Sequence, residues 1–339
     1  MTGHKGYIGT AMVPLLIAEG HQVVGLDSDL YAQCTFGEES RIQKIPELKK
    51  DIRDVEARDV EGFDAVIHLA GLSNDPLGNL NPKLTYEINH AASLRLAQLA
   101  KVAGVKRYIF SSSCSNYGAA GQDWVDEESE LKPLTPYGRA KVLVEEDVRQ
   151  LGDSDFCPVF PRNATVYGVS PRLRFDLVLN NLVAWAFATG KVHLKSDGTA
   201  WRPLIHVKDI ARALIAILNA PAERVCNQAL NIGTTEENYR VRELADIVID
   251  TVRGSRVEFA EGASADQRSY RVNCDKVSRT LPEFKPEWNV RLGAKELYDA
   301  FRKYGLHLEE FEGPRYKRVA HIKKMMEVGR LDETLRWKK

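Results

Sequence analysis

A tyrosine and a lysine four residues apart, Tyr137 and Lys141, are well suited to acid–base chemistry. Residues at this spacing share one face of an α-helix, and Pro136 with the apolar Val142 and Val144 predicts a helix that begins near Tyr137. An ammonium group beside a phenol stabilises the phenolate and lowers its pKa from about 10. We therefore expect Tyr137 to act as a general base toward a substrate hydroxyl and as an acid in the reverse direction.

The hydroxyl of Ser113 is a further candidate for the same chemistry. Residues 106–113 are predicted to form a strand that ends in three consecutive serines, and Ser113 lies 24 residues before Tyr137. A hydroxyl at a strand end can hydrogen-bond the oxygen on which Tyr137 acts and hold it in position. Taken alone, Tyr137 and Lys141 also fit an ordinary surface pair; Ser113 favours the catalytic interpretation.

A glycine-rich turn, with Gly3, Gly6 and Gly9, precedes the apolar helical run of residues 12–18. Such turns bring backbone N–H groups against a pyrophosphate at the positive end of a helix. Glycines also form ordinary turns, so the pattern gains its weight from the motifs later in the chain.

An acidic residue, Asp27, ends a short apolar segment 24 residues after Gly3. Residues 22–27 are predicted to be a strand buried on both faces, as in parallel sheets. A carboxylate at the end of this strand can accept hydrogen bonds from the adenosine ribose and would repel a 2′-phosphate, which favours NAD over NADP. A loop carboxylate or a helix cap is the alternative interpretation of Asp27.

Two later segments are expected to complete the cofactor site. Asp51 and Ile52 follow a basic stretch and can lie beside the adenine. Leu69 and Ala70 end the predicted strand of residues 65–71, where small residues leave room for a nicotinamide cofactor at the strand ends.

The composition is that of a globular protein without an obvious polyanionic partner. Of 339 residues, 44% are hydrophobic and 28% charged, and 47 basic residues balance 47 acidic ones. We therefore expect no nucleic-acid partner. No apolar run reaches the roughly 18 residues that span a bilayer, and no signal-peptide pattern is present, so no membrane partner is expected.

The cysteines Cys34, Cys114, Cys157, Cys226 and Cys274 are scattered without Cys-x-x-Cys spacing. This distribution predicts reduced thiols in a cytoplasmic protein rather than a disulfide framework or a zinc site. No metal site is expected.

Strands and helices alternate along the first half of the chain, which predicts an α/β fold on a doubly wound parallel sheet. Beyond about Gly168 the alternation loosens, and a smaller α/β lobe is predicted. We expect residues 1–168 to form an NAD-binding domain of Rossmann type, to which residues 203–235 return. Residues 169–202 and 236–314 then form the substrate-binding lobe. The basic segment 315–339 is predicted to be helical and solvated, and no function is assigned to it.

In the order of its motifs the sequence resembles the extended short-chain dehydrogenases/reductases, within the NAD-dependent nucleotide-sugar epimerase/dehydratase group (UDP-glucose 4-epimerase-like). The resemblance spans about residues 1–290 and is carried by the glycine turn, Asp27, Asp51-Ile52, His68-Leu69-Ala70, Asn89, Ser111-Ser112-Ser113, Tyr117-Gly118, Tyr137 with Lys141, Tyr167-Gly168, Arg202 and His206-Val207-x-Asp209. It implies that Ser113, Tyr137 and Lys141 are catalytic and that Lys141 also hydrogen-bonds the nicotinamide ribose. The NAD site that it implies comprises Gly3, Gly6, Tyr7, Ile8, Gly9, Asp27, Asp51, Ile52, Leu69, Ala70 and Asn89, together with Tyr137 and Lys141.

The resemblance also implies where a nucleotide-diphosphate sugar would bind. Asn180, Asn181 and Leu182 resemble an Asn-Asn-Leu segment of galactose epimerases, and Arg202 resembles an arginine that pairs with the diphosphate. Arg268 would add a second such contact, and Asn163 is expected in the same site. Solvated arginines and a capping asparagine are the alternatives. A homodimer, formed through helices near residues 82–103 and 137–151, is implied as well.

The residues after Ser113 bear on the reaction. Dehydratases of the resembled group carry an acid pair directly after the catalytic hydroxyl, whereas this sequence has Cys114-Ser115-Asn116. We expect an NAD-dependent nucleotide-sugar epimerase that acts at C4 through a transient 4-keto sugar, with Tyr137 as acid and base. The alternatives are a nucleotide-sugar 4-ketoreductase, dehydrogenase or dehydratase, and a non-catalytic NAD-binding regulatory protein. Thr165 stands where many relatives have asparagine, so the sugar and the nucleotide are left open.

The strand that should lead into the glycine turn is missing, since only Met1 and Thr2 precede Gly3. In a doubly wound sheet the first strand is central, between the strands that end at Asp27 and Ala70. We therefore expect two unpaired strand edges in the core. We also expect a natural protein that begins several residues upstream with an apolar strand, of which this chain is a truncated or mis-started form.

Overall fold

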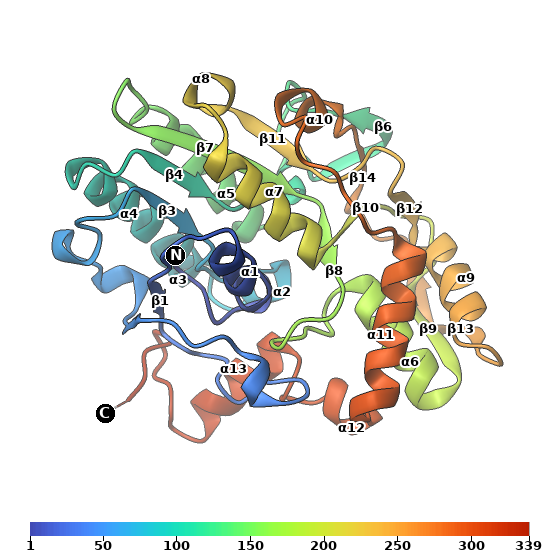
Figure 1. Ribbon diagram of the computed structural model, residues 1–339. Coiled ribbons are helices and arrows are strands. Elements are labelled where there is room, and N and C mark those ends of the chain that lie inside the picture. Colours follow the sequence, from blue (N-terminus) through green and yellow to red (C-terminus); the bar gives the residue numbers. More distant parts are fainter. Residues whose placement is uncertain (339) are drawn as a thin grey trace.

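Parallel strands form the centre of the N-terminal half of the computed structural model, which describes residues 1–338 (Figure 1). Four strands follow the order β11–β7–β4–β3, with β5 beside β7, and β1 pairs with β2 further along. The strands are β1 (Gly25–Asp27), β2 (Glu47–Lys49), β3 (Ala65–His68), β4 (Arg107–Phe110), β5 (Ser112–Ser113), β7 (Cys157–Asn163) and β11 (Ala229–Ile232). All these pairs are parallel, which confirms the predicted fold class.

A single residue, Thr2, takes the place of a strand between β1 and β3. It bridges Leu26 and His68 in parallel register, and its N–H donates to the Ile67 carbonyl at 2.9 Å. The Met1 carbonyl accepts from the Leu26 N–H at 2.9 Å, so pairing extends over Met1 and Thr2. The position of the first segment between β1 and β3 was predicted correctly. The expectation that these two strands have no partner between them is wrong at Met1 and Thr2, where backbone hydrogen bonds form.

Helices cover both faces of the sheet (Figure 1). On one face α1 packs against α7, and on the other α4 packs against α5. The helices of this half are α1 (Tyr7–Ala18), α2 (Asp75–Gly78), α3 (Pro82–Tyr86), α4 (Ala92–Val102), α5 (Pro136–Arg149), α7 (Val207–Asn219) and α8 (Ala222–Val225), with single turns at η1 (Glu39–Arg41), η2 (Ile52–Asp54), η3 (Ala57–Asp59) and η5 (Cys114–Tyr117). Neighbouring residues of β4, Tyr108 and Ile109, are buried in opposite core clusters, as expected of a strand covered on both sides.

The predicted helical stretch of residues 82–103 is not one regular helix. A π-helical turn, η4 (Glu87–Ala91), separates α3 from α4. This turn contains Asn89, whose side chain holds a neighbouring loop. A single π-helical turn of this kind is rare within helices and was not predicted.

The second lobe contains three small sheets, of order β12–β10–β8, β13–β9 and β14–β6. Its strands are β6 (Ala119–Val125), β8 (Thr165–Tyr167), β9 (Lys191–Ser196), β10 (Trp201–His206), β12 (Asn238–Arg240), β13 (Arg256–Ser264) and β14 (Ser269–Val272), and its helices are α6 (Val178–Thr189), α9 (Val241–Thr251), α10 (Asp275–Thr280) and α11 (Val290–Tyr304). Three of these strands come from segments that were assigned to the N-terminal domain: β6 and β8 lie within residues 1–168, and most of β10 lies within residues 203–235. We propose to keep the expected domain division, with β6, β8 and β10 contributed to the sheets of the lobe by the segments of the first domain.

The C-terminal segment is packed against the N-terminal half. It contains α12 (Leu308–Phe311) and α13 (Arg318–Glu327), and in Figure 1 the red chain runs beneath the sheet to end below β1. Ile322 and Met325 of α13 are buried in the same core cluster as Leu26 and Tyr108. The prediction of a solvated helix is therefore wrong, because α13 turns an apolar edge toward the sheet.

Two cysteines that were expected to be reduced form a disulfide, Cys157–Cys226, with their Cα atoms 4.9 Å apart. Cys157 begins β7 and Cys226 follows α8, just before β11, the strand that pairs with β7. Their proximity depends on strand order and is invisible in a sequence separation of 69 residues. Cys34, Cys114 and Cys274 are free and buried. The disulfide removes the basis for the expected cytoplasmic location.

Within residues 1–338, no helix is long and apolar enough to cross a membrane. The same residues contain no group of three or more His, Cys, Asp or Glu side chains that could hold a metal ion.

Candidate active site

A cavity of about 870 Å³ lies at the carboxyl ends of the parallel strands, between the sheet and the second lobe. This is where open α/β sheets bind their ligands. The predicted site residues that line it are Gly3, Gly6, Tyr7, Ile8, Gly9, Asp27, Asp51, Ile52, Leu69, Ala70, Ser113, Tyr137, Lys141, Asn163, Asn181, Leu182, Arg202 and Arg268. Asn89 and Asn180 are not part of this lining.

The glycine turn is packed so tightly that side chains are excluded from it. Gly3 has φ +72°, and a Cβ there would lie 2.7 Å from the Ala70 nitrogen. A Cβ on Gly9 would lie 2.4 Å from the Gly3 carbonyl oxygen. The turn ends at Gly6, the N-cap of α1, where no side chain accepts from the first helical N–H groups. These N–H groups lie at the end of α1 that borders the cavity. They can donate hydrogen bonds to an anion there.

Asp27 is held rigidly at the end of β1. Its carboxylate accepts hydrogen bonds from the Asp29 N–H at 2.8 Å and the Lys5 N–H at 3.0 Å. Burial nevertheless raises the pKa of this carboxyl group. Asp51 is held in a similar way, because its carboxylate caps η2 and pairs with Arg53 at 2.7 Å, while the adjacent Ile52 is buried.

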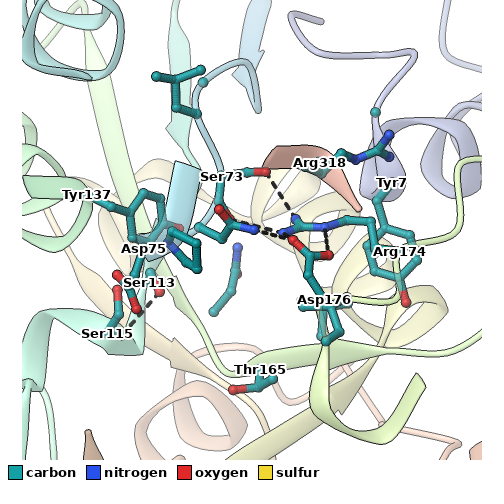
Figure 2. Close-up of a pocket in the computed structure, with 18 of the residues that line it drawn as sticks. Tyr7, Ser73, Asp75, Ser113, Ser115, Tyr137, Thr165, Arg174, Asp176 and Arg318 are labelled. Carbon is teal, nitrogen blue, oxygen red and sulfur yellow. Dashed lines mark hydrogen bonds and ion pairs between the residues drawn. The ribbon is translucent and has the colours of Figure 1, made fainter. Parts of the chain in front are cut away.

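Ser113, Tyr137 and Lys141 come together beneath the second lobe. Tyr137 lies in the first turn of α5, which begins at Pro136 as predicted, and the Thr135 hydroxyl caps this helix by accepting from the Gly138 N–H at 3.2 Å. One turn later, Lys141 is buried and its Nζ donates to the Ser111 carbonyl at 2.5 Å. The Ser113 hydroxyl accepts from the Ser115 N–H at 3.1 Å (Figure 2).

The protonation of this pair differs from the expectation. Burial raises the pKa of Tyr137 to about 12, although the facing Ser113 hydroxyl lowers it. Burial also lowers the pKa of Lys141 to about 7. The expected lowering of the phenol pKa is therefore wrong, because desolvation of the buried phenol outweighs the lowering by Ser113. The lysine Nζ lies 5.9 Å from the centre of the tyrosine ring.

Asn89 and Asn180 do not line the cavity, but their side chains hydrogen-bond the backbone of segments that do. The Asn89 amide forms two hydrogen bonds with the backbone of Leu72, of 2.7 and 2.9 Å. The Asn180 amide accepts from the Gly168 N–H at 3.0 Å and donates to the Arg174 carbonyl at 2.9 Å. Both side chains are buried, and we interpret them as residues that position the lining loops.

The two arginines that were expected to bind a diphosphate form ion pairs with carboxylates of the protein. Arg202 and Arg268 each donate to the Asp266 carboxylate, at 2.6 and 2.8 Å, and Arg268 also pairs with Asp75 at 2.8 Å. Asn163 donates to the Ser111 hydroxyl at 2.8 Å. Nearby in the lining, Asn181 donates to the Phe175 carbonyl at 2.9 Å, and Leu182 is buried.

A family model described as "NAD dependent epimerase/dehydratase family" matches residues 1–233. UDP-glucose 4-epimerase 4 of Oryza sativa subsp. japonica is 30% identical over 330 residues, which cover 88% of this chain and 87% of that protein. The chain belongs to the NAD-dependent epimerase/dehydratase family.

Solved structures support the same family. The structure titled MoeE5 in complex with UDP-glucuronic acid and NAD is 27% identical, has a TM-score of 0.76 and covers 89% of this chain and 98% of its own. DesIV, a dTDP-glucose 4,6-dehydratase from Streptomyces venezuelae with NAD and TYD bound, shares the fold with a TM-score of 0.76 at 24% identity, over 89% of this chain and 96% of its own. NAD is accordingly the cofactor of this chain.

The residues present fit this cofactor. The glycine turn leaves the start of α1 bare for a pyrophosphate, and Asp27 offers its carboxylate at the neighbouring strand end, where a ribose can be recognised. Ser113, Tyr137 and Lys141 lie in the same cavity, so a nicotinamide and a sugar can both reach them.

Several cavity residues were not predicted from the sequence. Arg174 and Asp176 form a bidentate ion pair with two hydrogen bonds of 2.9 Å, and Arg174 also donates to the Ser73 hydroxyl at 3.1 Å (Figure 2). Burial alone would raise the pKa of Asp176, but Arg174 lowers it overall. Asp75 and Arg318 also line the cavity. An opposite-charge pair inside the otherwise apolar run of residues 173–179 is the sequence signal that could have drawn attention to Arg174 and Asp176.

Proposed function

We propose that this protein is a nucleotide-sugar epimerase that inverts C4 through a transient 4-keto sugar. The observation that carries the proposal is the convergence of Ser113, Tyr137 and Lys141 on the cavity that holds the glycine turn, without a carboxylate among residues 114–116. The name of the rice relative, a UDP-glucose 4-epimerase, supports the same reaction.

The proposed roles follow from the chemistry of each side chain. The Tyr137 phenol exchanges a proton with the 4-hydroxyl, and the Ser113 hydroxyl holds the same oxygen while lowering the phenol pKa. The Lys141 ammonium, one turn along α5, stabilises the phenolate when the lysine is protonated. NAD, held by the glycine turn and Asp27, would supply the hydride acceptor and donor for oxidation of the sugar carbon and its reduction on the opposite face. The proton leaves with oxidation and comes back with reduction, so the net reaction is an isomerisation.

The substrate side of the cavity suits a diphosphate. Arg202 and Arg268 are guanidinium forks that match phosphate oxygens, and Asp266 holds both in place between them. We propose that they bind the diphosphate, with Asn163, Asn181 and Leu182 beside the nucleotide and sugar.

The test is a panel of UDP-, GDP- and dTDP-sugars incubated with the purified protein, with C4 epimers resolved by NMR. The expected result is interconversion of one epimer pair without net change in NADH. Tyr137→Phe should lower kcat by about 10²- to 10⁴-fold, the usual contribution of a general acid–base group. Tyr86→Phe, outside the cavity lining, should leave kcat unchanged.

Other outcomes distinguish the alternatives. Net consumption or production of NADH would identify a ketoreductase or a dehydrogenase, and loss of water from the sugar would identify a dehydratase. Full activity of Tyr137→Phe toward an accepted sugar would refute the proposed mechanism. Binding of NAD without turnover of any sugar would favour a regulatory protein.

We further propose a homodimer formed through α4 and α5. Within residues 1–338, Val142 and Leu143 of α5 are half-buried and pack against neither core cluster. Their exposed apolar surface is the feature that supports a partner at this face.

A further inference from the structure

Arg318, the first residue of α13, is a buried cation without an acidic partner. Its side chain is 2% exposed, and within residues 1–338 it forms no ion pair. Nη2 donates to the Arg172 carbonyl at 3.1 Å, whereas Nη1 has no hydrogen-bond partner. The guanidinium carbon lies 3.9 Å from the centre of the Tyr31 ring. A buried charge without a counterion is costly, so this position favours an anionic ligand.

The carboxylate that acts on Arg318 from the cavity lining, Asp176, is already engaged by another arginine. Asp176 is already bound by Arg174 through both carboxylate oxygens. Burial lowers the pKa of Arg318, and Arg174 adds to this lowering; Tyr31, Cys34 and Asp176 offset it only in part. The electrostatic environment therefore leaves Arg318 in need of negative charge from outside the protein.

The position of Arg318 indicates which anion it can bind. It lines the same cavity as Gly6, Tyr7 and Asp27, and in Figure 2 it lies on the side of Tyr7, away from Tyr137 and Ser113. The N-terminus of α1, a helix of 12 residues without a side-chain cap, opens into this cavity as well. The uncapped N–H groups come from the start of the chain, and the unpartnered guanidinium comes from its end. Both favour an anionic ligand.

We propose that Arg318 binds the pyrophosphate of NAD together with the N-terminal backbone of α1. The pyrophosphate is the anionic part of the cofactor, and a guanidinium provides the planar fork that phosphate oxygens accept. In this proposal the C-terminal segment contributes a residue that contacts the cofactor.

The contacts of the C-terminal segment support this assignment. His321 hydrogen-bonds the Leu30 carbonyl through Nε2 at 2.9 Å, and the Trp337 indole donates to the Ser28 carbonyl at 2.7 Å. Both partners belong to the loop that directly follows Asp27. The segment therefore fixes the loop beside the ribose site and places Arg318 over Tyr31 of the same loop.

The test is calorimetric titration of NAD, ADP, adenosine and UDP into full-length Arg318→Met that has been stripped of bound nucleotide. NAD and ADP should each bind about 10- to 100-fold more weakly, the effect of losing a hydrogen bond to a charged group. The affinities for adenosine and UDP should be unchanged. Lys323→Met, an exposed residue of the same helix, should behave as wild type.

Thermal unfolding provides an independent readout. Without nucleotide, Arg318→Met should melt at the same or a higher temperature than wild type, because it removes an uncompensated buried charge, and saturating NAD should raise its melting temperature by less. Arg318→Lys keeps the charge without the planar fork and should bind NAD with intermediate affinity.

Each of the remaining outcomes overturns the proposal. An equal loss for NAD, ADP and adenosine would mean that Arg318 only supports the loop after β1. A loss confined to UDP would assign Arg318 to the diphosphate of the sugar nucleotide. Unchanged affinity for all four compounds would leave Arg318 without a role in binding.

Discussion

Two buried basic side chains near the strand ends, His68 and Lys141, resist protonation. Burial lowers the pKa of His68 to about 3, and the charge of Lys141 contributes to the same shift. The neutral His68 ring hydrogen-bonds the hydroxyls of Thr2 and Ser93, each at 2.7 Å. Thr2 is the residue that pairs with both β1 and β3. Protonation of His68 would therefore disturb a hydrogen bond to the residue at the centre of the sheet.

This linkage predicts a stability that falls in acid. Between pH 6.5 and about pH 3 the unfolded chain binds a proton at His68 and the folded chain does not. The free energy of unfolding therefore rises with pH across this window, by up to about 1.4 kcal/mol per pH unit from this group. His68→Gln should remove that slope, so its deficit relative to wild type should be smaller at pH 4.5 than at pH 7.5 in urea unfolding.

The difference between the two proteins isolates His68 from carboxyl groups that titrate in the same range. His307→Gln, at an exposed position, should follow the wild-type curve. A His68→Gln deficit that is constant from pH 4.5 to pH 7.5 would contradict a neutral buried imidazole.

Also at the scale of residues, part of the candidate site could be predicted from the sequence and part could not. Tyr137 and Lys141 could be found because helix geometry alone puts residues four apart on one face. The raised pKa of Tyr137 could not, because it results from desolvation by the whole cavity. Arg318 could not be found either, since it reaches the cavity from a segment about 300 positions after the glycine turn.

At the scale of elements, the Cys157–Cys226 disulfide joins the start of β7 to the turn between α8 and β11. Backbone contacts tighten the same junction, where the Asn227 N–H donates to the Pro158 carbonyl at 2.7 Å. The cross-link closes a long chain segment that contains α6, β8, β9, β10 and α7. It therefore restricts the unfolded chain far more than it changes the folded one.

Cys226→Ser should lower the free energy of unfolding by about 2–4 kcal/mol, the usual effect of removing a native disulfide. Urea unfolding of the oxidised protein measures this change. Dithiothreitol should bring the wild type to the level of the variant and leave the variant unaffected. Alkylation in denaturant without reductant should modify three of the five cysteines, and modification of all five would contradict the disulfide.

Elements set by local signals were predicted well, and those set by distant partners were not. The start of α5 follows from Pro136 and the Thr135 cap, which lie next to each other in the chain. The π-helical turn at residues 87–91 and the pairing of β6 with β14 depend on neighbours far away in the sequence. Likewise, the sheet position of Thr2 is decided by its two flanking strands rather than by its own propensity.

At the scale of the whole molecule, the two halves meet across the cavity through ion pairs. Asp75 lies beside Tyr137 (Figure 2). Its carboxylate accepts from the Thr135 hydroxyl at 2.6 Å and pairs with Arg268 of the second lobe at 2.8 Å. Arg268 is the residue proposed to bind the substrate diphosphate. A bound diphosphate would therefore compete with Asp75 for one guanidinium, which connects substrate binding to the contact between the halves.

The outer face of α4 and α5 leads to the last prediction, which concerns assembly. If Val142 and Leu143 lie in a dimer interface, Leu143→Glu should place two charges in an apolar contact and convert the dimer to a monomer. Sedimentation velocity of wild type and variant over a range of concentrations measures the change. Leu292→Glu, a 50% exposed position in α11 of the second lobe, is the matched control outside α4 and α5 and should remain dimeric.

Retained NAD binding in Leu143→Glu would show that the variant is folded, because residues from both ends of the chain line the cavity. A wild-type protein that sediments as a monomer at every concentration would refute the homodimer. A Leu143→Glu protein that stays dimeric would place the interface on another face, since burying two uncompensated carboxylates is far more costly than exposing two leucines.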